Sequence, residues 1–293
     1  MKHGWMYALA LVAVLSACHS GEEAPPAVDL SGLEEIRIDF ERTGWGSVEE
    51  HFTIMPTAGG TFVLRGRYET RQGSGVDVEM PLASNKVADF VRETSSPGWT
   101  RQRGVQVLAQ GVDQRALRKF DAVIRVPPAP CSDEELQHLA RRHFGRTGLL
   151  TLVDEHYGHG ISWTDDYPHA LIQMRWRGRP TFMIWSNSQK ARMLPWHPGM
   201  PVDSPQEADQ NWSLPLSVSL QALLPPQSFT YGRLGDGDMA QRLNRSAMYK
   251  AERQCEALRG GSDRMRALGR TGKFPPVLQR SGPPVATRSP PCA

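Results

Sequence analysis

Length, composition and charge limit what the chain can be. It has 293 residues, of which 39% are hydrophobic and 22% are charged, with a net charge of +3; once a leader and a tail are set aside, this is enough for one large or two small folded units. The positive charge belongs to the C-terminus, because residues 260–293 contain six Lys or Arg and a single acid, Asp263. The charge is therefore no argument for a nucleic-acid-binding body, and we expect no nucleic-acid partner.

The first 17 residues have the pattern of a signal peptide. Lys2 supplies a positive charge and is followed by an apolar run, WMYALALVAVL, which is too short for the roughly 20 residues of a bilayer span. The run ends in Leu15-Ser16-Ala17-Cys18, which closely resembles the lipobox of bacterial lipoproteins. A plain signal peptide with a coincidental cysteine, or a buried N-terminal helix, would be the alternatives.

The resemblance implies that residues 1–17 are removed and that Cys18 is acylated, so that the lipid bilayer is the first partner of the chain. His19, rather than Asp, at the second mature position resembles lipoproteins passed on to the outer membrane. We therefore expect a chain held at the periplasmic face of the outer membrane, in the bacterial cell envelope. Residues 18–32, with small, charged and proline side chains, are expected to form a lipidated tether.

Cysteine usage fits such an oxidising compartment. After lipidation Cys131, Cys255 and Cys292 remain, and they share no metal-ligand spacing, so we expect no zinc site and no cofactor. Their odd number predicts one disulfide and one spare thiol. Cys131–Cys255 is the favoured pair, and Cys255–Cys292 is the alternative.

Residues 33–126 have the pattern of a sheet-rich first lobe. "EIRIDFERT" alternates apolar and charged residues, and "HFTIM", "TFVLRGRYETR" and "VDVEM" follow with turns between them. This predicts an antiparallel meander with one solvated face. Ser84 is expected to cap a short helix, and a further strand, "VQVLAQ", and a short helix from Asp113 are expected to complete the lobe.

Residues 131–259 are expected to form a second lobe after the proline-rich joint "VPPAPC". Ser132 and Glu135 form a capping box that begins a helix, which Gly145 ends, and an irregular stretch follows. A hairpin is predicted with its turn at 177–179, and a last helix is predicted from about Asp238 to Arg259. Residues 260–293 are expected to be a disordered basic tail. The fold class expected is α+β, with antiparallel sheets and a few helices in two closely packed lobes.

Reactive side chains are concentrated in residues 154–169, "DEHYGHGISWTDDYPH", which we expect to be loop-like. Imidazole and carboxylate groups together can bind a divalent metal or act as a general base and its orienting partner. Yet His-x-x-His in a glycine-containing loop does not place both rings on one helix face, and a polar recognition loop is the alternative. The low-ranked catalytic candidates are His156, His159, Asp165 and Asp166.

Tryptophan and arginine alternate in the second lobe, and both residue types dominate protein-interface hot spots. Trp176 and Trp185 are expected in the core, whereas the arginines of the hairpin are expected to face outward as a basic strip suited to an acidic partner. The interaction candidates are Arg175, Arg177, Arg179, Arg192, Trp163 and Trp196.

These patterns favour a non-catalytic lipoprotein that binds a protein partner in the envelope. An immunity or inhibitor protein acting against an envelope-acting toxin or hydrolase is the specific version. The alternative is a periplasmic metal-dependent hydrolase that uses residues 154–169. A structural envelope-assembly factor would share the features of the first class.

Overall fold

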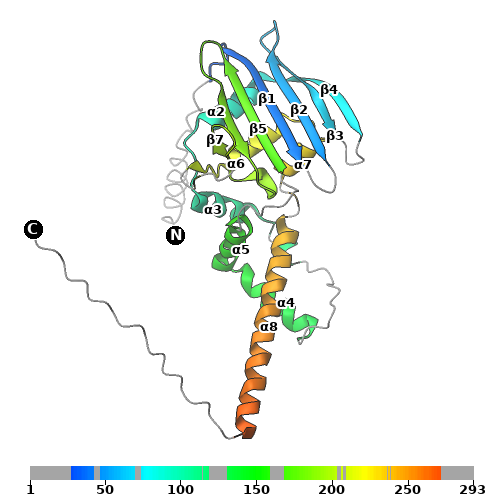
Figure 1. The fold of residues 1–293 in the computed structure, drawn as a ribbon, viewed down its shortest axis with the longest axis vertical. Coiled ribbons are helices and arrows are strands. Elements are labelled where there is room, and N and C mark those ends of the chain that lie inside the picture. The colour runs from blue at the N-terminus through cyan, green and yellow to red at the C-terminus, as the bar shows by residue number, and fades with distance from the viewer. Residues whose placement is uncertain are drawn as a thin grey trace, which may run out of the picture. The chain divides into compact units, whose positions relative to one another are not determined.

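The described strands form one antiparallel sheet. The computed structural model describes residues 28–42, 47–69, 74–113, 115–118, 131–158, 168–202, 206, 209–235, 237 and 239–271. Within these residues, seven strands lie in the order β4-β3-β2-β1-β5-β6-β7 (Figure 1). Their bounds are β1 Leu33–Arg42, β2 Val48–Pro56, β3 Phe62–Glu69, β4 Gly75–Leu82, β5 Pro168–Trp176, β6 Phe182–Ser186 and β7 His197–Pro198.

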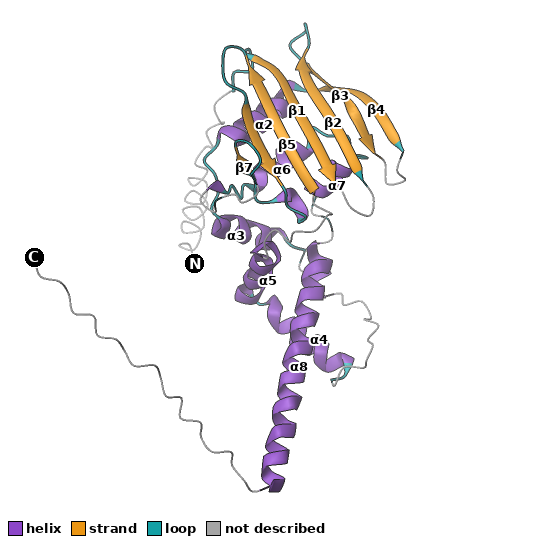
Figure 2. Cartoon of the chain, in the orientation of Figure 1, coloured by secondary structure: helices purple, strands orange, loops and turns teal. Residues whose placement is uncertain are grey.

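The helices of the described chain confirm the expected α+β class (Figure 2). They are α2 Ser84–Ser95, α3 Arg101–Gly111, α4 Asp133–Arg141, α5 Arg146–Gly158, α6 Leu214–Gln221, α7 Phe229–Leu234 and α8 Met239–Thr271, with short 3-10 turns η1 Ala116–Arg118, η2 Arg142–Phe144 and η3 Ala191–Met193. Among the residues described, no helix has both the length and the apolar character needed to cross a membrane.

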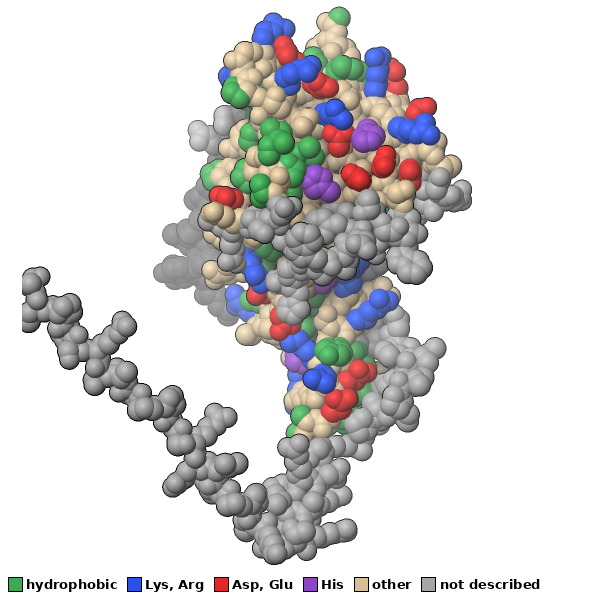
Figure 3. Space-filling model, in the orientation of Figure 1, with side chains coloured by type: hydrophobic (Ala, Val, Ile, Leu, Met, Phe, Trp, Pro, Cys, Tyr) green, Lys and Arg blue, Asp and Glu red, His purple; other side chains and the backbone are tan. Residues whose placement is uncertain are grey.

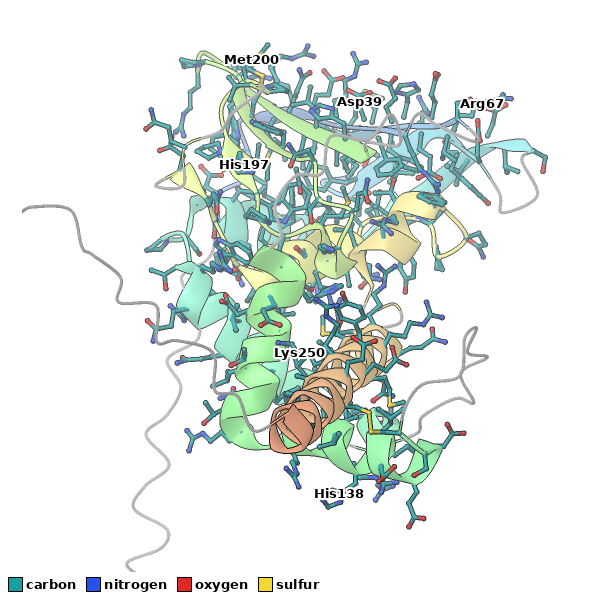
Figure 4. The ribbon with its side chains drawn as sticks, turned by 60° about the horizontal axis from the view of Figure 1, so that its bottom comes forward. Asp39, Arg67, His138, His197, Met200 and Lys250 are labelled. Atoms are coloured by element: carbon teal, nitrogen blue, oxygen red, sulfur yellow. A yellow bond between two sulfur atoms is a disulfide. The ribbon has the colours of Figure 1, made fainter. Side chains whose placement is uncertain are left out.

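One face of the sheet is covered by helices, and no helix of the described chain lies on the other. Helices α2, α6 and α7 lie against the covered face (Figures 1 and 4). Ile36, Ile38 and Phe40 of β1 point to that side and are fully buried, and each such side chain stabilises the fold by about 1.5–3 kcal/mol. Arg37 and Asp39 alternate with them and point to the other side, which we call the open face. The alternation predicted from the sequence, with one solvated face, is therefore confirmed for β1.

Two local expectations in the first lobe are wrong. "VQVLAQ" lies in helix α3, not in a strand, because Val105, Leu108 and Ala109 are buried at helical spacing and the Thr100 hydroxyl accepts from the Arg103 amide at 3.3 Å. Ser84 is the first residue of α2 and not its cap, since its hydroxyl donates to the Gly60 carbonyl at 2.8 Å instead. The short helix expected from Asp113 is the 3-10 turn η1.

The capping box at the start of α4 is confirmed. The Ser132 hydroxyl accepts from the Glu135 amide at 3.2 Å, and the Glu135 carboxylate accepts from the Ser132 amide at 2.7 Å. The helix gives way to η2 and ends before Gly145, as expected. The stretch after Gly145 is helix α5 rather than irregular chain, since Leu149, Leu152 and Val153 are buried at helical spacing.

The expected division into lobes 33–126 and 131–259 does not follow the sheet. Strand β1 of the first expected lobe pairs with β5 of the second along its length, from Leu33↔Trp176 to Arg42↔Pro168. The chain instead divides into one unit of residues 1–112 and 153–239 and another of residues 113–152 and 240–293. A strand in the middle of a sheet needs a hydrogen-bonding neighbour on each side, and the chain supplies the second neighbour of β1 only after the helices α2 to α5.

The smaller unit contains the disulfide that was favoured from the sequence. Cys131 and Cys255 are joined with their Cα atoms 6.3 Å apart, linking the start of α4 to α8. The Asn244 side-chain amide donates to the Ala116 carbonyl at 2.9 Å in the same unit. Cys292 lies outside the described residues.

Helix α8 is longer than the sequence pattern predicted. It runs through Gly260-Gly261 to Thr271, so the expected end at Arg259 is wrong and residues 260–271 of the expected disordered tail are helical. Each glycine costs a helix about 1 kcal/mol relative to alanine, and "RMRALGR", which follows, is rich in strong helix formers. The rest of the expected tail, residues 272–293, is outside the described chain.

Candidate interaction face

Side chains of all seven strands meet in one row across the open face. The row follows from the register of each strand pair. Asp39 and Arg67, two of its members, point away from the helices in Figure 4. In strand order from β7 to β4 its residues are His197, Trp185, Leu171, Asp39, His51, Arg67 and Asp77. The row changes character at β1, from aromatic and apolar to charged.

The charged half of the open face covers β1 to β4 (Figure 3). We define it by the members of its ion pairs and of the His51–Asp39 hydrogen bond. These are Arg37–Asp39 at 2.8 Å, His51–Asp39 at 2.7 Å, Arg65–Glu79 at 3.1 Å and Arg67–Asp77 at 3.3 Å. Most of these side chains are more than half exposed, and exposed pairs contribute about 0–1 kcal/mol to stability. A partner can therefore replace them with its own charges at little cost to the fold.

The other half of the open face contains an aromatic–imidazole cluster, formed by His169, Trp185 and His197. The Trp185 ring centroid lies 4.6 Å from that of His197 and 5.9 Å from that of His169. Trp185 is 2% exposed and His197 is 3% exposed. The indole Nε1 of Trp185, the Nε2 of His169 and the Nδ1 of His197 are buried and have no hydrogen-bond partner among the residues that the structure describes.

Burial favours the neutral form of both imidazoles of this cluster. Removal from water lowers the pKa of His169, and the nearby Glu41 carboxylate offsets part of that effect. The pKa of His197 is lowered in the same way, with Asp209 as the opposing charge. The strand order places the indole of β6 between the two imidazoles, so the rings do not converge on one point. Within the described chain, no group of three His, Cys, Asp or Glu side chains could hold a metal ion.

The stretch 154–169 begins in a helix and ends in a strand, so it is not the continuous loop that was expected. Residues 154–158 are the last turn of α5, and His169 lies in β5. Asp154 accepts from Arg101 Nε at 2.7 Å, and the Tyr157 hydroxyl donates to the Ala191 carbonyl at 3.0 Å. The His156 ring meets Tyr157 edge-on, with centroids 5.2 Å apart. The candidates His159, Asp165 and Asp166, together with Trp163, lie outside the described residues.

The arginines of the β5–β6 hairpin do face outward, but acids lie beside them. Arg175 contacts Glu35 at 2.9 Å and Glu34 at 3.4 Å, and Arg177 contacts Glu34 at 3.6 Å. Arg179 lies over the Trp176 ring at 5.8 Å. The expected basic strip is therefore a mixed rim, because residues at the start of β1 bring carboxylates to it.

Arg192 and Trp196 belong to the interior rather than to an interaction surface. Trp196 is 1% exposed, and its indole Nε1 donates to the Ser217 hydroxyl at 2.9 Å. Arg192 is half-buried and donates to the Leu234 carbonyl at 3.0 Å. Both side chains hold the segment before β7 against α6 and α7, so neither is exposed enough to anchor a partner in this structure.

Of the two tryptophans expected in the core, Trp185 is buried there and Trp176 is not. Trp176 shares the covered side with Met174 and is only half-buried at the end of β5. Trp185 is buried, but it lies on the open face opposite Leu171. The hairpin pairs Met174 with Phe182 and so places the two tryptophans on opposite faces.

Glu50 is a buried acid that the sequence analysis did not single out. Its carboxylate is fully buried and accepts from the amides of Phe229 and Thr230, each at 2.7 Å, at the start of α7. Desolvation raises the pKa of Glu50 even though these hydrogen bonds act in the opposite direction. The sequence did contain an indication of its burial: Glu50, Phe52 and Ile54 are alternate residues of one strand, so all three lie on the covered side of the sheet.

A hollow of about 640 Å³ lies beside residues 28–32, at the end of the sheet where the chain enters β1. Val91, Met174 and Trp176 form apolar parts of its wall, and Arg177 and Arg179 lie at its rim. Asp29, which lies in the same wall, offsets part of their charge.

Comparison with known proteins gives no match: no family model fits the chain, and no curated protein or solved structure matches it.

Proposed function

We propose that the protein is a lipoprotein of the bacterial envelope that binds a protein partner through the charged half of its open face. The lipobox resemblance at Cys18 supports the anchoring, and the helix-free face of the sheet supports the binding. The observation that carries the proposal is the mosaic of exposed acids and bases on β1 to β4, held in fixed register.

A mosaic of this kind suits selective protein binding. The strands fix the spacing of the charges before any partner arrives, so little conformational entropy is lost on binding. The fixed order of acids and bases, as in Asp39–His51–Arg67–Asp77, rejects surfaces whose charges fall in another order. An immunity or inhibitor protein that covers an envelope-acting toxin or hydrolase is the form of this function that we propose.

Site-specific photo-crosslinking tests the binding face. A benzoylphenylalanine at Thr53, between Arg37 and Arg65 in the sheet, is expected to give a discrete adduct in cells that express the partner. The same probe at Val218 of α6, which is 44% exposed, is the matched control and is expected to give none.

Charge reversal makes the test specific. The Thr53 adduct is expected to fall severalfold in an Arg37→Glu/Arg65→Glu background, because two favourable contacts become repulsive. Equal adducts at Thr53 and Val218, or an adduct at Thr53 that ignores the reversal, would contradict the proposed face.

A further inference from the structure

We infer that the free edge of β4 takes up an extended segment of the partner as an eighth strand, and that this segment alternates apolar residues with Lys or Arg. The inference rests on the proposed function, because it gives a chemistry to the protein partner. The added strand would form main-chain hydrogen bonds with the outer edge of β4, a contact that the side chains of the charged half do not provide.

The two edges of the sheet are built differently. Strand β7 has two residues, and Pro195, Pro198 and Pro201 lie in or beside it. Strand β4 has eight residues and pairs with β3 in one continuous register, from Phe62↔Leu82 to Glu69↔Gly75. In the described part of the chain, β3 is the only strand beside it. Proteins usually protect sheet edges with short strands, prolines, bulges or charged side chains. This sheet uses short length and prolines at β7, whereas β4 carries a single proline, Pro81, near its end, and no described strand covers its outer edge.

The apolar side of β4 is incompletely covered. Val76, Val78 and Met80 point to the covered face, where their partners on β3 are Tyr68, Gly66 and Leu64. Leu64 is fully buried, whereas all three β4 side chains are only partly buried. An added strand with apolar residues at alternate positions would extend the core over them, at about 25 cal/mol for each Å² of apolar surface removed from water.

The polar side of β4 selects the intervening residues. Asp77 and Glu79 point to the open face, and their side chains are 83% and 62% exposed. Each contacts an arginine on β3 and is open on the side of the free edge. Opposite charges on neighbouring strands attract and like charges repel, so Lys or Arg is favoured at the facing positions.

The same acids disfavour a second copy of this chain as the occupant. In a two-fold symmetric dimer, β4 of one copy would pair antiparallel with β4 of the other. The apolar residues of both strands must then lie on the same face of the joined sheet. The registers with the greatest overlap then place Asp77 or Glu79 of one copy opposite Asp77 or Glu79 of the other, where the like charges are destabilising. A basic strand from a different protein has no such conflict.

A labelled peptide tests the inference directly. The probe is a blocked nine-residue peptide of alternating Val and Lys, titrated against the full chain in detergent and followed by fluorescence anisotropy. We expect saturable binding that falls about tenfold in Asp77→Lys/Glu79→Lys, because two attractive pairs become repulsive. The same variant should bind the corresponding Val and Glu peptide more tightly than the wild type does.

Two controls separate strand addition from simple charge attraction. Glu41→Lys/Glu49→Lys reverses two exposed acids on the inner strands β1 and β2, and we expect the affinity for the Val and Lys peptide to stay within about twofold. A peptide N-methylated at alternate residues on its pairing edge cannot complete the ladder, and we expect its binding to be lost. Equal losses in both double variants, undiminished binding of the N-methylated peptide, or no binding at all would each overturn the inference.

The outcome can be separated from that of the proposed function. Adducts at Thr53 without peptide binding at β4 would leave the binding face in place and remove the added strand. Peptide binding at β4 without adducts at Thr53 would leave the added strand in place and remove the proposed binding face.

Discussion

At the scale of single residues, Glu50 of β2 links the sheet to helix α7 through hydrogen bonds. A carboxylate near the first amides of a helix is favourable, and Glu50 reaches those of α7 from β2. Phe229, which donates one of these bonds, also packs against Phe40 with ring centroids 5.6 Å apart. The contact stabilises the position of α7 on the covered face, although the buried charge carries a desolvation cost.

This cost predicts a specific pH dependence for Glu50→Gln. Because the folded-state pKa of Glu50 is raised above the value of 4.5, the folded chain binds this proton more tightly than the unfolded chain. The stability that Glu50 contributes is then complete below pH 4.5 and is lost as the pH rises through the folded pKa. Urea unfolding is expected to show the wild type losing stability relative to Glu50→Gln as the pH rises above 4.5.

Glu49 provides the control for this measurement. It is exposed and next to Glu50 in β2, so Glu49→Gln should track the wild type across the same pH range. The buried histidines titrate equally in all three proteins, and their contribution cancels in the difference. A constant gap between wild type and Glu50→Gln would show that the carboxylate is not desolvated in the folded chain.

Single-residue burial could be predicted where alternation alone decides it. Ile36, Ile38 and Phe40 were placed correctly, because strand period fixes the face of each side chain. Trp185 is in the core as expected, but its position on the open face depends on the hairpin register, which alternation does not reveal. Trp196 is a core residue whose indole donates to Ser217, twenty-one positions away, and no local pattern predicts such a contact.

At the scale of elements, the Cys131–Cys255 disulfide closes a loop across 124 positions of sequence. A bridge stabilises a fold mainly by restricting the unfolded chain, and it contributes about 2–4 kcal/mol in typical cases. Both cysteines belong to the smaller unit, where the bridge joins α4 to α8. Its stabilisation should therefore be concentrated in those helices.

Removal of the disulfide tests whether its stabilisation is concentrated in α4 and α8. Cys131→Ala/Cys255→Ala is expected to lose about 2–4 kcal/mol of unfolding free energy, with amide exchange rising in α4 and α8 more than in β1 and β2. Cys292→Ala is the matched control and should leave both measurements unchanged. A loss in Cys292→Ala equal to that in the double variant would favour the Cys255–Cys292 pairing instead.

Elements with a local signal were predicted well, and the others were not. The Ser132–Glu135 capping box fixed the start of α4, since its hydrogen bonds involve only neighbouring residues. The β-branched Val105 and Val107 suggested a strand, but burial against the rest of the unit produced helix α3. Gly260-Gly261 looked like a helix end, yet α8 continues through both. In each failure a weak local preference opposed a larger contribution from neighbouring segments.

At the scale of the whole molecule, the sequence indicated the class of fold but not which segments would share a sheet. The proline-rich joint suggested separate lobes, whereas β1 pairs with both β2 and β5. That pairing joins positions more than 125 residues apart, such as Ile36 and Met174, and only the completed sheet identifies it. The open face, and with it the charged half, follows from this long-range pairing.

Anchoring and binding should be separable properties of the whole chain. Ten residues lie from His19 to Val28, so a lipid on Cys18 would hold the body within about 35 Å of the bilayer surface. We expect Cys18→Ser to abolish labelling by radioactive palmitate and to release the protein from the membrane fraction or stall it before processing. The affinity of the purified variant for the Val and Lys peptide should stay unchanged, since β4 and the tether are separate in sequence. Membrane association that persists in Cys18→Ser would refute lipid anchoring and would leave the binding surfaces to be judged by their own tests.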